Sequence, residues 1–327
     1  MSKKRILSGM RPTGRLHLGH WLGALKKWVE LQDNYQCFYM IADWHALMSE
    51  YANPKDIKAN IRECLLDWLS VGIESEKATF FIQSEVKEHA ELHLLLSMIS
   101  PLSWLERCPT YKEQLRELKT RDISTYAYLG YPILQAADII IYKADAVPVG
   151  NDQLPHLELT REIVRRFHHF YGKSFPEPEP ILTETPKLLG LDNRKMSKSY
   201  NNFIALADSP ETISKKVTSM ITDPKRIRKT DKGHPGICNV FSYQEIFNRA
   251  ASEEIENACK KGLRGCTECK KMLAETLIVF LADFRARRKT WEERPEELSQ
   301  ILEKGKCLAR KVAGDTLQEV RKKMGLV

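Results

Sequence analysis

The sequence predicts an α/β fold, with a doubly wound parallel sheet in the first half and an all-helical domain after it. Strand-like apolar runs alternate with amphipathic helices up to the Pro-rich stretch Phe175–Pro180, and this alternation is typical of parallel sheets with right-handed crossovers. Beyond about residue 187 the pattern is almost entirely helical. We therefore expect a Rossmann-like domain over residues 1–186 and a helical domain over residues 187–327, with the last helix packing back on the first domain.

Each strand of the expected sheet is a short apolar run. The first lies at Arg5–Ser8 and the second at the buried-type segment Cys37–Ala42. Ala78–Ile82 follows as a third strand, and Ile139–Tyr142 and Ala146–Val149 are expected to complete the sheet. Ligands bind open parallel sheets at the carboxyl ends of the strands, so the residues that follow these runs are the first candidates for a site.

The helices follow from apolar periodicity and from end signals. Leu18–Leu31 carries one apolar stripe, made of Leu22, Leu25, Trp28 and Val29. Pro54–Ser70 has Asn53 as its expected N-cap and Pro54 at the first helical position. The apolar run after the third strand is expected to be helical up to Trp104. In the second half the candidate helices are Pro210–Met220, Tyr243–Ala251, Glu253–Lys261, Cys269–Arg287 and Pro295–Met324.

Composition and charge suit a folded protein with a polyanionic partner. The 327 residues are 43% hydrophobic and 29% charged, which is ordinary for a globular chain. No apolar run approaches the length of a membrane span, and residues 1–4 lead into a strand rather than a signal peptide, so we expect a cytoplasmic protein. The net charge is +8, which permits an RNA partner. The basic residues gather in two clusters, which also suit solvated helix faces and loops: Lys225, Arg226, Arg228, Lys229 and Lys232, and Arg285, Arg287, Arg288 and Lys289.

Two short motifs are suited to handling phosphate. His17-Leu18-Gly19-His20 falls where a helix is expected to begin, and the unpaired N–H groups and dipole of a helix start attract polyphosphate. The two imidazoles can bond phosphoryl oxygens, and Gly19 permits a close approach to the backbone. Lys195-Met196-Ser197-Lys198-Ser199 places two ammonium groups around a hydroxyl residue, which suits charge that builds on a transferring phosphoryl group. Either motif alone is also explained by a surface turn or a solvated loop, but the pair in this order indicates cleavage of ATP between its α- and β-phosphates.

Together these residues resemble the two signatures of the class I aminoacyl-tRNA synthetases. The middle of the chain narrows the resemblance to the tryptophanyl-tRNA synthetases, and it extends from about residue 5 to the C-terminus. The segments that carry it are Tyr131–Asp138, Val147–Gln153, Phe81–Glu85, His156–Arg161, Pro235–Ile237 and Lys195–Tyr200.

The resemblance implies two neighbouring sites. The residues it implies for ATP are Arg11, Pro12, Thr13, Gly19, His20, Gly150, Asn151, Asp152, Leu188, Lys195, Met196, Ser197, Lys198 and Ser199. The phosphates would be held by the groups with a catalytic role, which are His17, His20, Lys195 and Lys198. The residues it implies for tryptophan are Asp138, Gln153, Tyr131, Leu7, His45 and Gln135. It also implies Mg²⁺ with the ATP, tRNA(Trp) and L-tryptophan as partners, and a homodimer.

Asp138 is the candidate for amino-acid specificity. An indole presents one N–H donor on a large apolar body, so its site needs an acceptor at the bottom of an apolar pocket. Asp138 ends an apolar segment and supplies such an acceptor. A buried acceptor that loses its donor is costly, which penalises amino acids without that N–H. Without the resemblance, a helix-surface or capping carboxylate is the alternative.

Four residues depart from the usual pattern of the family. Leu7 stands where many bacterial relatives carry an aromatic residue, and His20 where many have Asn. Asn151 stands where Glu is common, and Gln135 replaces a typical Met. Gln-x-x-Asp also occurs in tyrosyl enzymes, and a phenol donates one hydrogen bond as an indole does, so a tyrosyl-tRNA synthetase is the runner-up. The sequence also permits a non-catalytic RNA-binding or redox-sensing paralogue and a small-molecule nucleotidylyltransferase.

Four of the eight cysteines form a cluster in the sequence. The spacing is Cys-x20-Cys-x6-Cys-x2-Cys, at Cys238, Cys259, Cys266 and Cys269. In a chain expected to be cytoplasmic this is not a disulfide framework. Four thiolates suit Zn²⁺ or a 4Fe–4S cluster, and unrelated cysteines are the alternative. A subset of the family that resembles this chain carries a 4Fe–4S cluster in the helical domain, so the resemblance favours iron–sulfur over zinc.

Overall fold

The chain forms two compact units. The computed structural model describes residues 3–108, 125–183, 188–194, 196 and 200–327. The first unit contains Met1–Gly14, Ala24–Glu184 and Trp291–Val327, and the second contains Arg15–Gly23 and Thr185–Thr290. The chain therefore enters the second unit twice, and its first passage there contains the His17–His20 motif.

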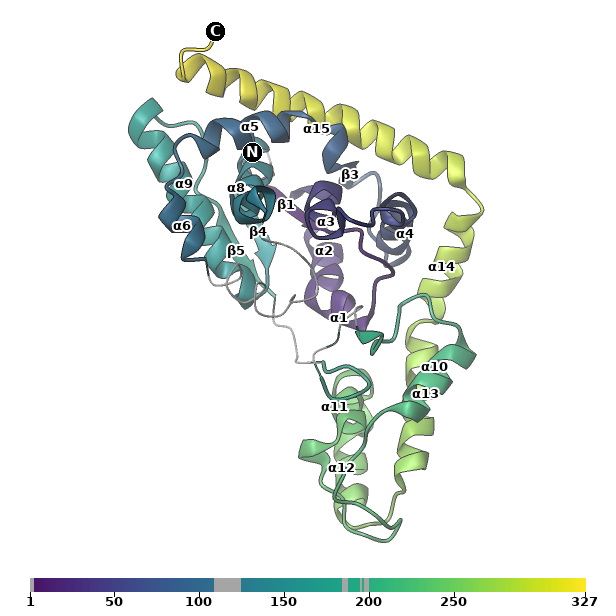
Figure 1. Cartoon of the computed structure of the whole chain (residues 1–327). Helices are drawn as coiled ribbons and strands as arrows, with labels where there is room; N and C mark the ends of the chain where they lie inside the picture. The colour runs from purple at the N-terminus through teal and green to yellow at the C-terminus, as the bar shows by residue number, and fades with distance from the viewer. Residues whose placement is uncertain (1–2, 109–124, 184–187, 195, 197–199) are drawn as a thin grey trace. The chain divides into compact units, whose positions relative to one another are not determined.

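A five-stranded parallel sheet forms the centre of the first unit (Figure 1). Its strands are β1 (Arg5–Met10), β2 (Gln36–Ile41), β3 (Ala78–Ile82), β4 (Ala146–Val149) and β5 (Glu179–Leu182). The spatial order is β3-β2-β1-β4-β5. The chain thus progresses outward on one side of β1 and then resumes on its other side at β4. This reversal is the topological switch point at which open α/β sheets bind ligands. The expected doubly wound class is confirmed.

Two details of the sheet differ from expectation. Ile139–Tyr142 is not a strand: Ile139–Ile141 form the last turn of the helix α8 (Tyr126–Ile141), and Tyr142 is its C-cap. A short apolar run has the same pattern in a buried helix as in a buried strand, and here the helix is buried. The outer strand β5 was not expected, because Pro180 lies in it. Pro180 is tolerated since β5 is an edge strand that pairs only with β4.

Helices surround the sheet in the first unit. They are α2 (Lys26–Leu31), α3 (Asp43–Glu50), α4 (Ile57–Ser70), α5 (Glu88–Ser97), α6 (Leu102–Glu106), α8, α9 (Leu154–Tyr171) and α15 (Pro295–Lys323). The helix α4 begins three residues later than expected. The backbone N–H of Ile57 donates to the carbonyl of Pro54 (3.1 Å), so Pro54 opens a turn ahead of the helix and Asp56 is the N-cap.

The long helix α15 packs on β3 and α5 (Figure 1). Its residues Ala309, Ala313 and Leu317 belong to the same core as Leu7 and Phe38 of the sheet. The approach is closest at Gly305, where an added Cβ would collide with the backbone carbonyl of Phe80. Residues at the C-terminus thereby cover part of a sheet whose strands lie between Arg5 and Leu182. No helix in the described part of the chain is both long and apolar enough to cross a membrane.

The second unit is helical. Its helices are α1 (Leu18–His20), α10 (Pro210–Ser219), α11 (Asn239–Phe247), α12 (Ser252–Lys260), α13 (Cys266–Phe280) and α14 (Ala282–Glu292), which leads into the first unit. The single helix expected over Leu18–Leu31 is interrupted by a π-helical turn at Trp21–Leu25. The helix expected over Cys269–Arg287 is two helices, α13 and α14, that meet at Leu281.

Candidate active site

The carboxyl ends of β1 and β4 flank the switch point and carry the candidate ATP residues of the first unit. Arg11, Pro12 and Thr13 follow β1 directly, and Gly150, Asn151 and Asp152 follow β4. Pro12 is buried, whereas Arg11, Asn151 and Asp152 are exposed. A Cβ at Gly150 would lie 2.7 Å from Oδ1 of Asp152, so only glycine lets this carboxylate fold back over the backbone. The two segments form a polar edge where a nucleotide is expected.

The spacing of His17-x-Gly-His20 is explained by a capping box at the start of α1. Nδ1 of His17 accepts the backbone N–H of Gly19 (3.1 Å), and Nδ1 of His20 accepts the backbone N–H of His17 (3.2 Å). Because each Nδ1 accepts, the proton of each neutral ring lies on Nε2, which is then a hydrogen-bond donor. The ring centroids are 3.8 Å apart. The two imidazoles therefore form one unit with both Nε2 atoms set to donate, as phosphoryl oxygens require.

In the second unit the first signature motif pairs with residues 204–206, which follow the second motif in the sequence. The backbone of Leu18 donates to Ile204 (3.1 Å), and that of Leu206 donates to Leu16 (3.0 Å), so the first motif pairs with the segment that follows the second. Met196 lies over the first motif, since its Sδ is 3.4 Å from the position of a Cβ on Gly19. Lys195, Ser197, Lys198 and Ser199 lie outside the described residues. Leu188, expected near the adenine, is half-buried in this unit.

The candidate tryptophan residues of the first unit meet on one face of α8. Tyr131, Gln135 and Asp138 are spaced four and three residues apart, which places them on the same side of that helix. His45 of α3 reaches this face: its Nε2 lies 2.8 Å from Oδ2 of Asp138, and its ring stands edge-on to that of Tyr131 at 6.5 Å. Four of the six candidates thus share one location.

The remaining two candidates lie on other elements of the first unit. Leu7 is 3% exposed in β1 and belongs to the hydrophobic core. Gln153 is half-buried after β4, and its amide donates to the Asp152 carboxylate (3.0 Å).

Asp138 is a buried carboxylate whose two oxygens both have donors. Oδ1 accepts from Nδ1 of His89 (2.6 Å) and Nε2 of Gln83 (2.9 Å). Oδ2 accepts from Nε2 of His45 (2.8 Å) and the same Gln83 amide (2.9 Å). Burial alone would raise the pKa of Asp138, but the hydrogen bonds and charges of His45 and His89 lower this pKa below its usual range. The carboxylate is therefore ionised and fixed in place, which excludes the alternative of a surface carboxylate.

The contacts extend beyond Asp138 through the fully buried His89. Its Nε2 lies 2.7 Å from the hydroxyl of Tyr142. Burial, followed by the nearby charge of Asp138, raises the pKa of Tyr142 well above its ordinary value, so the hydroxyl stays protonated and donates. A second chain of contacts supports Tyr131, whose hydroxyl is 2.9 Å from Nε2 of His156, while Nδ1 of His156 is 3.6 Å from Sγ of Cys108. Burial lowers the pKa of His156, which keeps this imidazole neutral.

These supporting residues were not expected from the sequence. Gln83, His89 and Tyr142 are 55, 49 and four residues from Asp138 along the chain. Gln83 lies in Phe81–Glu85, one of the segments that carry the family resemblance, and it follows β3 directly, so either signal could have indicated it. His89 and His156 are both buried, and no role was assigned to either from the sequence.

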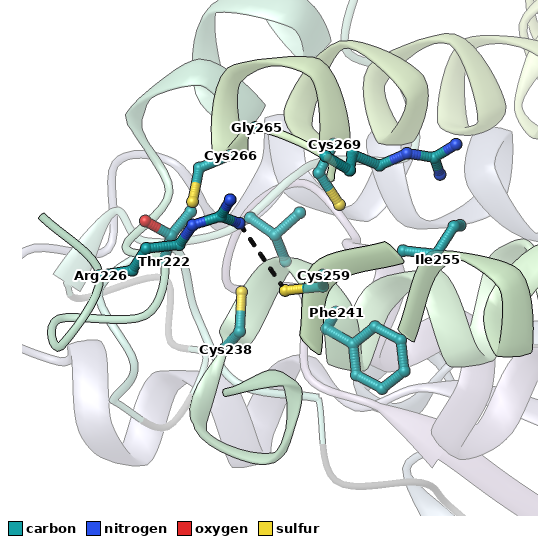
Figure 2. Close-up of a pocket in the computed structure, with 11 residues that line it drawn as sticks. Thr222, Arg226, Cys238, Phe241, Ile255, Cys259, Gly265, Cys266 and Cys269 are labelled. Atoms are coloured by element: carbon teal, nitrogen blue, oxygen red, sulfur yellow. Dashed lines mark hydrogen bonds between the residues drawn. The ribbon is translucent and has the colours of Figure 1, made fainter. Parts of the chain in front are cut away.

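The four clustered cysteines line one cavity of about 20 Å³ in the second unit (Figure 2). Cys238 precedes α11, Cys259 lies in the last turn of α12, and Cys266 and Cys269 lie in the first turn of α13. As the side chains stand, the described residues contain no group of three or more His, Cys, Asp or Glu close enough to hold a metal ion. The donor set nevertheless fits a thiophilic centre, because four sulfur ligands from three helix ends surround one space. Side-chain rotation would have to bring the sulfurs closer together.

Part of the basic cluster at 225–232 lies against these cysteines. Nη1 of Arg226 is 3.9 Å from Sγ of Cys259, and Nη2 donates to the carbonyl of Lys229 (2.5 Å). In the second basic cluster, Arg288 is only 6% exposed. Not every residue of the two clusters is therefore available to a polyanion. Lys225, Arg228 and Lys229 remain on the surface.

The order of the strands, the imidazole pair at a helix start and the position of Met196 beside that pair are those expected of a class I aminoacyl-tRNA synthetase. The family model for tRNA synthetases class I (W and Y) matches residues 2–282. The tryptophan–tRNA ligase of Thermotoga maritima is 48% identical over 99% of this chain and 99% of its own length. That of Aquifex aeolicus is 44% identical over 98% of this chain and 100% of its own.

A solved structure agrees with these relatives. The tryptophanyl-tRNA synthetase of Campylobacter jejuni, complexed with ADP and tryptophan, superposes with a TM-score of 0.88 at 34% identity and covers 98% of this chain and 100% of its own. The chain belongs to the tryptophanyl-tRNA synthetases. These relatives support the tryptophanyl enzyme over the alternatives that the sequence left open, which were a tyrosyl-tRNA synthetase, a non-catalytic paralogue and a nucleotidylyltransferase.

Proposed function

We propose that this chain is a tryptophan–tRNA ligase, which activates L-tryptophan with Mg·ATP and transfers it to the 3′ end of tRNA(Trp). The observation that carries the proposal is the ionised Asp138, held by His45, His89 and Gln83 at the carboxyl edge of a parallel sheet. It provides a fixed acceptor for the one polar atom of an indole. Relatives named tryptophan–tRNA ligase align with almost the whole chain.

The chemistry needs positioning rather than a general base. The carboxylate oxygen of tryptophan attacks the α-phosphorus, the bond between this phosphorus and the oxygen that bridges to the β-phosphorus breaks, and pyrophosphate leaves. Mg²⁺, when bound with ATP, would offset the charge of the leaving group. We propose that Nε2–H of His17 and of His20 donate to phosphoryl oxygens and that Lys195 and Lys198 neutralise the developing charge. The 3′-terminal ribose hydroxyl of the tRNA then attacks the carbonyl of the adenylate, which releases AMP.

The remaining candidate residues complete this arrangement. We propose that Tyr131, Gln153 and His45 border the amino-acid ammonium and ring, with Gln135 and Leu7 near them. Arg11–Thr13, Gly19, Gly150–Asp152 and Leu188 would take the nucleotide, with Met196, Ser197 and Ser199 over the phosphates. Residues 1–186 would form the catalytic domain, and residues 187–327 the domain that contacts the anticodon. A role in charging tRNA suits a protein of the cytoplasm.

Amino-acid-dependent pyrophosphate exchange tests the function. Wild type is expected to exchange with tryptophan and far less with tyrosine. Lys195→Ala is expected to lower the rate by at least about 100-fold, whereas Lys304→Ala, on the exposed side of α15, leaves it unchanged. Full exchange by Lys195→Ala would refute the phosphate assignment. Better exchange with tyrosine than with tryptophan would refute the specificity.

We also propose that Cys238, Cys259, Cys266 and Cys269 hold a 4Fe–4S cluster, with Zn²⁺ as the alternative. Four sulfur ligands suit either centre. When bound, such a cluster would tie together the starts of α11 and α13 and the end of α12. Protein purified without oxygen is expected to show a broad absorption at about 400 nm that bleaches with dithionite. A colourless protein that contains zinc would refute the iron–sulfur assignment and support the zinc alternative.

A homodimer is the final part of the proposal. The helices α5 and α6 both pack on α8, and these helices with the residue after α5 expose four large apolar side chains, which are Leu94 (54%), Met98 (66%), Leu102 (57%) and Tyr126 (73%). Exposed apolar surface of this kind suits a second copy of the chain. Sedimentation is expected to show a dimer for wild type and a monomer for Met98→Glu/Leu102→Glu. A wild-type monomer would contradict the assignment.

A further inference from the structure

Two buried side chains of α11 donate hydrogen bonds to the backbone ahead of the second signature motif. The hydroxyl of Tyr243 donates to the carbonyl of Leu189, and Nδ2 of Asn239 donates to the carbonyl of Gly190, each at 2.7 Å. Asn239 is 4% exposed and Tyr243 0%, and the two lie four residues apart on one face of the helix. Successive turns of α11 therefore hold successive carbonyls of this segment.

The direction of both hydrogen bonds follows from the groups involved. A carbonyl oxygen only accepts, so the NH₂ group of the Asn239 amide must face Gly190. Burial raises the pKa of Tyr243 above its ordinary value, so its hydroxyl stays protonated and donates. The segment is thus held by two donors, which substitutions of nearly the same shape can remove one at a time.

The helix that carries these donors is itself held in place. It packs on α13, and the amide of the fully buried Gln244 donates to the carbonyl of Cys269 in the first turn of α13 (3.1 Å). Asn239 and Tyr243 therefore project from a helix that is fixed within the second unit.

The held segment also packs against the chain that follows the second motif. The backbone N–H of Leu191 donates to the carbonyl of Asn202 (2.8 Å), and a Cβ on Gly190 would lie only 2.7 Å from the same oxygen. Two residues further on, the carbonyl of Ile204 accepts the backbone N–H of Leu18 in the first motif (3.1 Å). Contacts therefore lead from α11, through this segment, to the imidazole pair of the first motif.

We infer that Asn239 and Tyr243 are positioning residues for ATP: they hold the backbone between Leu188 and the second signature motif in the place that nucleotide binding requires. The inference rests on the proposed function, in which Leu188 takes the nucleotide and the second motif lies over the phosphates. Each of the two residues acts through the carbonyl that it holds. The candidate tryptophan residues lie in the first unit, so loss of either donor is expected to affect ATP rather than tryptophan.

The test uses Tyr243→Phe and Asn239→Leu, which remove the two donors at nearly constant shape. Pyrophosphate exchange is measured with ATP varied at saturating tryptophan, and with tryptophan varied at saturating ATP. The KM for ATP is expected to rise about fivefold in each variant, while the KM for tryptophan stays within about twofold of wild type. An unchanged KM for ATP in both variants, or equal rises for the two substrates, would overturn the inference.

A matched control is Tyr39→Phe. Tyr39 is also a fully buried tyrosine whose hydroxyl donates to a backbone carbonyl, that of Trp28 (3.0 Å), but it lies in β2 of the first unit. This variant is expected to lose stability and to keep the KM for ATP of wild type. A rise in that KM equal to the rise in Tyr243→Phe would show a general effect of lost stability, and it would overturn the inference.

A crystal structure of wild type with Mg·ATP decides the matter if neither variant folds. The inference predicts that both hydrogen bonds persist and that the adenine lies within about 4.5 Å of residues 188–190. Failure of either expectation overturns it. A wild type without ATP-dependent exchange would instead refute the proposed function itself.

Discussion

His89 joins Asp138 to Tyr142, with Nδ1 2.6 Å from the carboxylate and Nε2 2.7 Å from the phenol hydroxyl. The ring is fully buried and uses both nitrogens in this way. Since Tyr142 stays protonated, it donates to Nε2, so the ring proton of His89 that faces Asp138 lies on Nδ1. The charge of Asp138 is therefore stabilised by the buried His89 as well as by His45 of the candidate site.

Asp138→Asn is expected to make the free energy of unfolding less dependent on pH in the acid range. Because the folded-state pKa of Asp138 is lowered, ionised Asp138 adds stability above its unfolded pKa of about 3.9, and this stability is lost as the pH falls further. The variant lacks this titration, and it also breaks a buried pair, at a cost of about 3 kcal/mol near neutral pH. Urea unfolding from about pH 7 down to about pH 3 should show the two free energies of unfolding converging below about pH 4. Parallel curves would contradict the pairing.

Gly19→Ala is expected to impair ATP use more than folding. An added Cβ would lie 3.0 Å from the ring of His17 and 3.4 Å from Sδ of Met196, so the imidazole has to shift by a few tenths of an ångström from its capping position. We expect kcat/KM for ATP to fall by at least about tenfold, with a loss of stability of about 1 kcal/mol from the disturbed cap. The control is Gly236→Ala, where an added Cβ meets nothing within 4 Å. Unchanged ATP kinetics in Gly19→Ala would argue against the capping box as part of the site.

Two glycines of α15 give variants with opposite effects on stability. A Cβ at Gly305 collides with the backbone of Phe80, whereas a Cβ at Gly314 meets nothing within 4 Å. Gly305→Ala is expected to destabilise the protein by about 2 kcal/mol or more, since a backbone carbonyl cannot rotate away. Gly314→Ala is expected to stabilise it by about 0.5–1 kcal/mol through helix propensity. Thermal unfolding of both variants measures this, and equal effects would argue against the packing of α15 on β3.

Much of the fold could be predicted because local pattern and tertiary environment agree. The sequence segments of β2 and β3 are apolar, and both form buried strands as expected. Prediction failed where the tertiary environment determines the secondary structure. The apolar run at the end of α8 is a buried helix rather than a strand, and Pro180 is accepted in β5 only because that strand lies at the edge of the sheet.

The main residues of the candidate site could be predicted from the sequence, but the hydrogen-bond partners that hold them in place could not. Asp138, His45 and Tyr131 could be named from motifs, but the partners that fix them lie far away in the sequence, as Gln83 and His156 do. Such contacts depend on which helix faces meet in three dimensions. The capping role of His17 and His20 is an exception, because an N-cap residue and a side chain three positions later form a recognisable local pattern.

Cys238→Ser tests whether the four cysteines act as one metal centre. Each lines the same cavity, and a cluster that loses one thiolate loses both a bond and a fixed geometry. We expect wild type purified without oxygen to contain about four iron atoms per chain and Cys238→Ser to contain less than half of that. Cys307→Ser is the matched control, because Cys307 is exposed on α15 and outside the set, so its iron content should equal that of wild type. Iron content that is equal in all three proteins would show that the metal is bound elsewhere, and removal of bound metal by a chelator should then leave the unfolding of α11–α13 unchanged.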